Sequence, residues 1–526
     1  MNRILSILLA ALTGLVVTVS VSASPVQAAT DCSRATLLSL TYLPCEVQNI
    51  ALSTQSIVSH KDLLPGLAQA TLAYQKARDA ALAKDHERQP NPNSCTTVVL
   101  CEIDPRLENW TSRGGIVEPV LYTSRSGATM SGHIWATKAG PAKRAGVFYI
   151  NGSIIGYEQA YWFIAQSLAK AGFVVMTFDA QGEGMSDQFG EKPDQTEDAF
   201  AGIPGLGILG PLKVNGLSLG GNGLPFYDGG TDALDFFTST PAKPYVPRAS
   251  RSSGTSHNAK QVRRVKAGLN SAYNPLWKML DSAKIGVSGH SYGAEAASWL
   301  AQSDPRIDAA VIADNLCIPV SPSPDEVASF TAPNPDFGGL PHLPYGFNRN
   351  CFGAPPGPAP AITKPALGIT GDYIAPVPYL IVPHPLGKSR ASLAYSAAGV
   401  DSGQIIIRGG SHIDFADETQ GLPSTLRGVD ITAWYTTAWF KKYLQKDPKG
   451  EAMLLTQRWR NDAAAGKIDP ARDPNILSWH FRSRLDIGKL NGTAFQCENL
   501  RTGCTGQTTA ANDGWTGPYS FVIATH

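Results

Sequence analysis

The sequence is poor in charge, and its charges are nearly balanced in sign. Only 17% of the 526 residues are Asp, Glu, Lys or Arg, and 44 basic residues against 43 acidic ones leave a formal net charge of +1. A basic excess, as expected for binding to nucleic acid or to an anionic membrane, is missing, so neither partner is indicated. Glycine and proline are plentiful, at 51 and 38 residues, which indicates a globular protein with long ordered loops.

Long apolar runs are also lacking, except at the N-terminus. Residues 4–21 form an apolar run interrupted only by Ser, Thr and Gly, behind the positive charge of Arg3, and residues 26–28 offer small side chains to a signal peptidase. This pattern predicts a secretory signal over residues 1–28. No later segment has the roughly 18 uncharged apolar residues that a membrane helix needs. We therefore expect a secreted protein with no membrane anchor after signal cleavage.

The eight cysteines lack the spacing of a metal site. None lies in a C-x-x-C pair or in a Cys/His cluster of zinc spacing, and no cofactor motif is present, so we expect neither metal nor cofactor. Cysteines of an exported chain usually form disulfides. Many connectivities are possible, and proximity alone pairs sequence neighbours: Cys32–Cys45, Cys95–Cys101, Cys317–Cys351 and Cys497–Cys504.

Apolar periodicity divides the mature chain into three parts. Residues 29–114 include a helical pattern and are predicted to form an N-terminal extension that carries the first two disulfides. Residues 115–444 begin with a predicted hairpin over 115–137 and continue as short buried strands alternating with helices. The segments 187–228 and 317–365 interrupt this part as insertions, and residues 445–526 form a C-terminal extension.

The alternation of strands and helices predicts an α/β fold with a mostly parallel central sheet flanked by helices. After the hairpin, strands are expected within residues 145–152, 172–179, 283–289, 307–315, 366–372 and 403–412. Helices are expected over residues 158–171, 231–237, 259–280, 294–302 and 430–444.

The pattern G-x-S-x-G, typical of a nucleophilic serine on a sharp strand-to-helix turn, occurs twice. Ser291 has a short apolar strand before it and strong helix formers, Ala294 to Ala297, after it. Ser218 has neither, because glycines and Pro225 follow it, and we interpret it as part of a loop. Ser291 is therefore the candidate nucleophile.

A base and an acid for Ser291 come later in the chain, in the order that this architecture uses. His412 follows an apolar strand and a Gly-rich loop, which would let its ring swing over the neighbouring strand end. Asp372 and Asp314 both end strands, and either carboxylate would lie at the same sheet edge as His412. We favour Asp372 as the acid and keep Asp314 as the alternative.

These motifs resemble those of the α/β-hydrolases, in particular serine esterases and lipases. "FYINGSIIG" matches the loop after the third strand, and "DAQGEGMSD" resembles the family turn D-x-x-G-x-G-x-S. "GDYIAPV" and "GGSHIDFA" resemble the acid and histidine loops of secreted actinomycete cutinases and polyester hydrolases. The resemblance implies Asp372 as the acid and the backbone N–H groups of Ser153 and Tyr292 as oxyanion donors. Asn151 stands where the family usually has His.

Three functions compete on these residues. The first is a secreted esterase or lipase that acts on small or polymeric esters through Ser291, His412 and an aspartate. The second is a peptidase or acyltransferase with the same triad, and the third is a non-catalytic binding protein. The apolar segment 201–212 is a hypothetical lid over an acyl chain, with packing on the core as the alternative.

Overall fold

The computed structural model describes residues 44–45, 63–89, 110–153, 157–194, 213–214, 217–218, 223–319, 351, 354–355, 357–373, 390–417, 426–460 and 473–508. The predicted signal segment, the segment 201–212, and Cys32, Cys95 and Cys101 lie outside these residues. Within the described part of the chain, no helix combines the length and apolarity needed to cross a bilayer.

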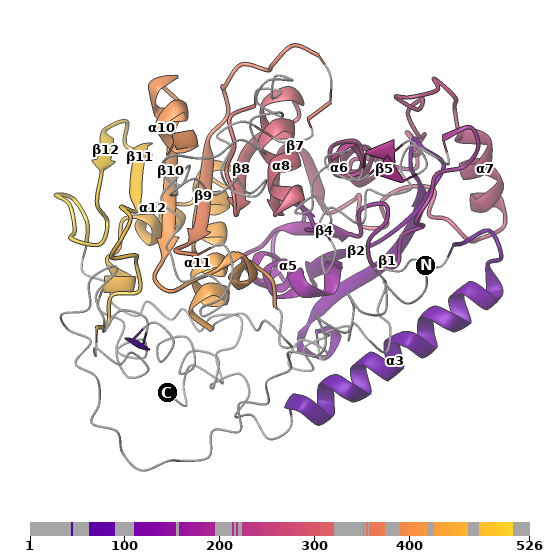
Figure 1. Ribbon diagram of the computed structural model, residues 1–526, viewed down its shortest axis with the longest axis horizontal. Helices are drawn as coiled ribbons and strands as arrows, with labels where there is room; N and C mark the ends of the chain where they lie inside the picture. The colour runs from indigo at the N-terminus through magenta and orange to yellow at the C-terminus, as the bar shows by residue number, and fades with distance from the viewer. Residues whose placement is uncertain are drawn as a thin grey trace.

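The centre of the structure is a ten-stranded mixed sheet (Figure 1). Its strand order is β1-β2-β4-β3-β7-β8-β9-β10-β11-β12. The strands are β1 (Gly115–Thr123), β2 (Thr129–Thr137), β3 (Arg144–Ile150), β4 (Val174–Phe178), β7 (Leu280–His290), β8 (Ile307–Ala313), β9 (Ala366–Gly371), β10 (Ser402–Ile407), β11 (Arg484–Gly488) and β12 (Ala494–Cys497). A separate two-stranded sheet pairs β5 (Lys213–Val214) with β6 (Leu217–Ser218).

The expectation of a mostly parallel sheet is correct only for its middle. The six strands from β4 to β10 are mutually parallel, whereas β1, β2, β11 and β12 are joined by antiparallel pairings. Every residue of β3, β4, β9 and β10 is buried, as expected for parallel strands that are covered on both faces. The sheet is therefore mixed, and its parallel centre is the part that carries the candidate site.

Helices cover both faces of the sheet, and each face has its own apolar core. One core packs α5 (Trp162–Lys170), α11 (Leu426–Tyr443) and α12 (Pro448–Leu454) against the sheet. The other packs α6 (Leu224–Phe237), α8 (Tyr292–Ser303) and α10 (Arg390–Ala397). The fold is thus a three-layer α/β arrangement, with α3 (Leu63–Lys84) running along its outside (Figure 1).

Short helices complete the order: η2 (Thr111–Arg113), η3 (Glu158–Tyr161), α7 (Asn258–Lys266), η7 (His412–Phe415) and η8 (Arg458–Arg460). The expectation of one helix over residues 259–280 is wrong, because α7 ends at Lys266. Gly268 follows with a φ of 70°, in the left-handed region that ends helices. Asn274 then caps a turn by accepting a hydrogen bond from the backbone N–H of Leu276, so the chain enters β7 from a loop.

The residues after Leu444, expected as an extension, contribute to the same sheet. β11 pairs with the edge of β10, and β12 pairs with β11 across a tight turn at Gly492, whose φ is 84°. Before β11, the backbone N–H of Arg408 donates to the carbonyl of Ile476, and that of Ser478 donates to Ile406. This segment therefore reaches the end of β10, where the candidate site begins.

Two of the four expected disulfides lie within the described residues, and both are formed. Cys317–Cys351 closes the second insertion, and Cys497–Cys504 lies in the C-terminal part. The expected bridges Cys32–Cys45 and Cys95–Cys101 involve residues outside the described part. Cys317 follows β8 by only a few residues, so its bridge ties down the chain beside the candidate site.

We expect the Cys317–Cys351 bridge to stabilise the fold more than the Cys497–Cys504 bridge. The separations of 34 and 7 residues imply that the longer loop restricts the unfolded chain more. On the chain-entropy estimate, Cys317→Ala/Cys351→Ala lowers the free energy of unfolding by roughly 3–4 kcal/mol, and Cys497→Ala/Cys504→Ala by roughly 1 kcal/mol less.

Denaturant unfolding of both double variants measures this difference. A larger loss in the Cys497→Ala/Cys504→Ala protein would contradict the expectation.

Candidate active site

Ser291 lies on a sharp turn between β7 and α8. The strand ends at His290 and the helix begins at Tyr292, so one residue makes the whole turn. Its φ of 59° and ψ of −123° lie in a region that non-glycine residues rarely adopt, at a cost of about 1–3 kcal/mol. Such a turn lifts the serine side chain out of the strand and helix, as a nucleophile requires.

The two glycines of the motif are needed because the backbones approach closely there. A Cβ atom on Gly289 would overlap the carbonyl of Gly293, one turn further on. A Cβ atom on Gly293 would overlap the carbonyl oxygen of Ile150, at the end of the adjacent strand β3. Both glycines of the motif are therefore required, because any side chain at these two positions would overlap neighbouring backbone atoms.

The second copy of the motif lacks these features. Ser218 is in the two-residue strand β6, which pairs with β5 in a separate small sheet. The next helix, α6, begins at Leu224, so no strand-to-helix turn forms at Ser218.

His412 is paired in the structure with Asp314, the alternative acid, and not with Asp372, which the sequence favours. His412 Nδ1 lies 2.6 Å from Asp314 Oδ2. Asp314 directly follows β8, the strand next to β7, and His412 reaches over the end of β9 to meet it. Both side chains are partly accessible, at 23% for His412 and 14% for Asp314, so they line the surface of the site.

Asp372 is held away from the imidazole by other partners. Its Oδ2 accepts a hydrogen bond of 2.9 Å from the backbone N–H of Gly409, and its Oδ1 accepts one from the hydroxyl of Ser478. Ser478 belongs to the C-terminal part, which the sequence predicts to be an extension. Asp372 is fully buried and fixes the start of the histidine loop.

The histidine loop is further fixed by a cap on the short helix η7. Ser411 Oγ accepts from the backbone N–H of Ile413, while the Asp414 carboxylate accepts from the backbone N–H of Ser411. This reciprocal pair is a capping box. His412 thus has a fixed backbone on both sides.

The expected oxyanion donors lie on two sides of Ser291. Tyr292 is the first residue of α8, where backbone N–H groups point out of the helix end. Ser153 follows β3, and its hydroxyl donates 2.8 Å to the buried carboxylate of Glu183. Asn151, in the place of the family histidine, accepts a 2.9 Å hydrogen bond from the backbone N–H of Ala180. These contacts connect the loop after β3 to the turn after β4.

His290 and Tyr161 are parts of the site whose roles the sequence did not reveal. The phenol oxygen of Tyr161 lies 2.8 Å from His290 Nδ1, and His290 Nε2 lies 2.8 Å from the backbone carbonyl of His412. The rings of His290 and His412 are 4.6 Å apart between centroids. Burial lowers the pKa of His290 to about 3, and the charge of His412 acts in the same direction. No spacing rule could find this contact, since the partners are more than 100 residues apart.

The backbone N–H of Ser291 donates to the carbonyl of Ala313, the residue before Asp314, so Ser291 lies beside the pair of His412 and Asp314. Within the described residues, the ring of His412 and the hydroxyl of Ser291 are not hydrogen-bonded to each other. In substrate-free sites this bond often forms only when substrate binds. The neutral tautomer with Nδ1–H toward Asp314 leaves the Nε2 lone pair to take a proton. The arrangement can therefore activate a hydroxyl nucleophile.

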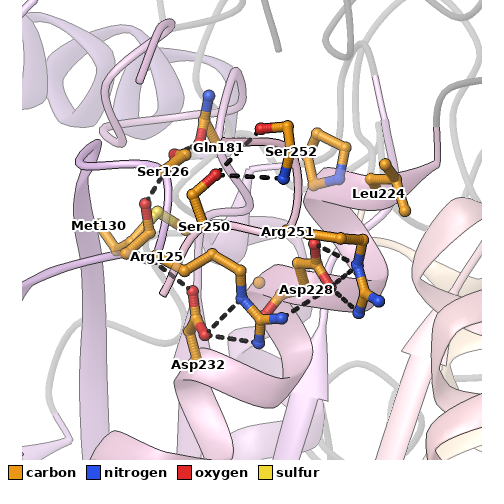
Figure 2. A pocket seen from close by; sticks show the side chains of 13 residues that line it. Arg125, Ser126, Met130, Gln181, Leu224, Asp228, Asp232, Ser250, Arg251 and Ser252 are labelled. Carbon is orange, nitrogen blue, oxygen red and sulfur yellow. Dashed lines mark hydrogen bonds and ion pairs between the residues drawn. The ribbon is translucent and has the colours of Figure 1, made fainter. Parts of the chain in front are cut away.

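A polar pocket lies away from these residues, between the turn of the first hairpin and α6 (Figure 2). The guanidinium of Arg125 donates to Asp232 at 2.7 Å and to Asp228 at 2.9 Å, and Arg251 donates to Asp228 at 2.7 Å. Burial alone would lower the pKa of Arg125, but the negative charges of Asp232 and Asp228 raise it above its ordinary value. The paired charges attach the hairpin to α6.

The size of this pocket excludes it as a substrate site. Its cavity of about 30 Å³ has room for roughly one or two water molecules. The amide Nε2 of Gln181, which lines it, has no hydrogen-bond partner among the described residues and suits such a water. Figure 2 shows Ser126 beside Gln181, to which its hydroxyl donates. We interpret the pocket as a structural polar cluster.

Potential metal ligands gather at one place in the described residues, where Glu295 meets Cys317 and Cys351. Both sulfur atoms are joined in a disulfide, so neither is a thiolate that could bind a metal. The group therefore does not fit a metal site.

No protein-family model matches this chain, and no curated protein matches it significantly.

The pairing of His412 with Asp314 predicts different effects for the two aspartates. Asp314→Asn should slow the reaction of Ser291 with a fluorophosphonate probe by on the order of 10³-fold or more, because the imidazole loses its tautomer control. Asp372→Asn retains an acceptor for Gly409 and should slow labelling by less than about tenfold. Labelling rates at pH 7.5, with circular dichroism to check folding, measure both.

A strong loss in folded Asp372→Asn together with a near-normal rate in Asp314→Asn would overturn this assignment.

His290 should make the protein less stable in acid. Its pKa is about 3 when folded, against 6.5 in an unfolded chain, so the unfolded state alone binds this proton between these values. Stability then falls as the pH drops, by up to about 1.4 kcal/mol per pH unit. The groups around the ring, Tyr161, His412 and Asp314, remain in the variant His290→Gln.

Denaturant unfolding between pH 6 and pH 4 should therefore give a shallower dependence for His290→Gln than for the unmodified protein. Equal slopes would show that His290 takes up its proton in the folded state.

Proposed function

We propose that this chain is a secreted serine hydrolase of the α/β-hydrolase fold that cleaves carboxylic esters. The 2.6 Å contact between His412 and Asp314, next to the strained turn at Ser291, is the observation that carries the proposal. Serine, aspartate and histidine follow parallel strands in this chain order, which supports the fold assignment. The disulfides support export, since such bonds persist in oxidising compartments.

The reaction begins with acylation of Ser291. His412 Nε2 takes the hydroxyl proton as Ser291 Oγ attacks the ester carbonyl, and the carbonyl π electrons move to oxygen. Asp314 stabilises the imidazolium that results. The tetrahedral intermediate collapses, the C–O bond to the alcohol breaks, and His412 gives its proton to the leaving alkoxide. The acyl group then remains on Ser291.

Water completes the cycle by the same steps. His412 removes a proton from water, the hydroxide attacks the acyl-enzyme, and the proton returns to Ser291 as the carboxylic acid leaves. The backbone N–H groups of Ser153 and Tyr292 hold the oxyanion in both halves. Donors that are fixed before the reaction need no reorganisation when charge develops, and one such donor contributes about 10²–10³-fold in rate.

The ester class rests on the histidine loop, residues 409–416, which resembles that of secreted cutinases and polyester hydrolases. Small and polymeric esters both remain candidate substrates. The apolar segment 201–212, a hypothetical lid over the acyl chain, lies outside the described residues. The substrate is therefore proposed as a class, and its chain length is left to measurement.

Hydrolysis of p-nitrophenyl esters from short to long acyl chains tests the proposal. Purified mature protein should release p-nitrophenol, and Ser291→Ala should lose about 10⁴-fold or more of this activity while staying folded. Ser218→Ala is the matched control, because it removes the other G-x-S-x-G serine and should leave the rate unchanged. The acyl-chain profile then separates an esterase from a lipase.

Equal activity in Ser291→Ala would refute the nucleophile. If the protein reacts with a fluorophosphonate but hydrolyses no ester, the ester hydrolase proposal is refuted. The alternatives are then cleavage of an amide, or transfer of the acyl group to an acceptor other than water.

A further inference from the structure

An unbroken series of hydrogen bonds runs beneath the candidate site, from the loop after β3 to the backbone of His412. The backbone N–H of Gly152 donates 3.1 Å to the phenol oxygen of Tyr161. The Tyr161 hydroxyl and His290 Nδ1 are 2.8 Å apart, as are His290 Nε2 and the carbonyl oxygen of His412. These residues come from four separate places in the chain, so the series joins elements that are distant in sequence.

The direction of each hydrogen bond is fixed by its ends. A backbone carbonyl can only accept, so His290 Nε2 carries the proton toward His412. A neutral imidazole then has a bare Nδ1, which must accept from the Tyr161 hydroxyl. The Tyr161 oxygen accepts in turn from the N–H of Gly152. The neutral tautomer of His290 with its proton on Nε2 is therefore compatible with all three hydrogen bonds of the series.

The two ends of the series are the two loops that the reaction must hold in register. Gly152 directly precedes Ser153, the expected oxyanion donor, and a Cβ atom on Gly152 would come within 3.2 Å of Ser291 Cβ and 3.3 Å of His290 Nδ1. His412 is the expected base. The series therefore passes directly beneath the nucleophile and couples the oxyanion loop to the base.

We propose that Tyr161 and His290 are positioning residues that hold the oxyanion loop at Gly152 and the backbone of His412 in register around Ser291. This inference rests on the proposed function of the triad. Neither side chain is hydrogen-bonded to a reacting atom, and each acts through a backbone group. A displacement of about 1 Å between base and oxyanion donor is enough to cost on the order of 10²-fold in rate.

The packing around both side chains shows that they are built into the fold. Tyr161 is 1% exposed and stacks on Tyr149 at 4.6 Å between ring centroids, while His290 is 5% exposed and lies 5.8 Å from the ring of Phe415. A ring held on both faces has little freedom to break its hydrogen bonds. The series therefore keeps its geometry through the catalytic cycle.

Removing one hydroxyl tests the proposal with minimal disturbance. Tyr161→Phe keeps the stacked ring and deletes the link between Gly152 and His290. We expect kcat for p-nitrophenyl esters to fall by about 10- to 100-fold, with KM changed by less than about threefold, because substrate contacts are untouched. Tyr149→Phe is the matched control: it also deletes a buried phenol oxygen, which has no hydrogen-bond partner within the described part of the chain, and should leave kcat unchanged.

The two residues should also behave as one unit. His290→Phe breaks the series at its centre, so adding Tyr161→Phe to it should reduce kcat by less than about threefold further. His290→Gln can still donate to the His412 carbonyl and should recover part of the loss. Multiplying effects in the double variant, or a normal kcat in Tyr161→Phe, would overturn the proposal.

A readout without ester chemistry separates this inference from the proposed function. In protein labelled with ¹⁵N-histidine, NMR should show His290 with a proton on Nε2 and a bare Nδ1, and Tyr161→Phe should shift the Nδ1 resonance. The rate of fluorophosphonate labelling of Ser291 should fall in Tyr161→Phe and not in Tyr149→Phe. If these NMR and labelling results are obtained but the protein hydrolyses no ester, only the ester substrate is refuted. If His290 instead carries its proton on Nδ1, the positioning role is refuted.

Discussion

The hydrogen bond between His412 and Asp314 is the interaction on which the rest of the candidate site depends. It joins loops that follow β10 and β8, two strands separated by β9, so it forms only if both loops are held firmly. The bridge from Cys317 fastens the chain just after Asp314, and Asp372 fastens the start of the histidine loop through Gly409. The polar groups and the disulfide near the sheet edge are therefore explained by the need to keep this one distance short.

Much of this arrangement could be predicted from the sequence. Buried strands such as β3 and β9 are continuous apolar runs, and the glycines around Ser291 mark a turn in which side chains would overlap the backbone. Both signals are local, because they depend on a residue and its near neighbours in the chain. The strands of the parallel centre, the hairpin and the position of Ser291 were accordingly placed correctly.

The choice of acid could not be predicted, because it depends on a contact between distant parts of the chain. Asp314 and Asp372 both end buried strands, and the local sequence favours Asp372 only through its resemblance to a family acid loop. The hydroxyl of Ser478, more than 100 residues away, takes up one oxygen of Asp372, and the backbone of Gly409 takes up the other. The tail could reach this position only because β11 pairs with β10, and the short strand β11 gives a weak sequence signal.

Charge explains why the histidine beneath His412 must be neutral. In the proposed acylation His412 becomes an imidazolium, and a second cation with its ring centroid 4.6 Å away would oppose that step and compete for Asp314. Burial keeps the pKa of His290 at about 3, so its ring meets the imidazolium as a neutral dipole that donates to the His412 carbonyl. An apolar side chain would avoid the charge but would remove the hydrogen bonds that His290 makes with that carbonyl and with the Tyr161 hydroxyl. A buried, neutral imidazole satisfies both demands at once.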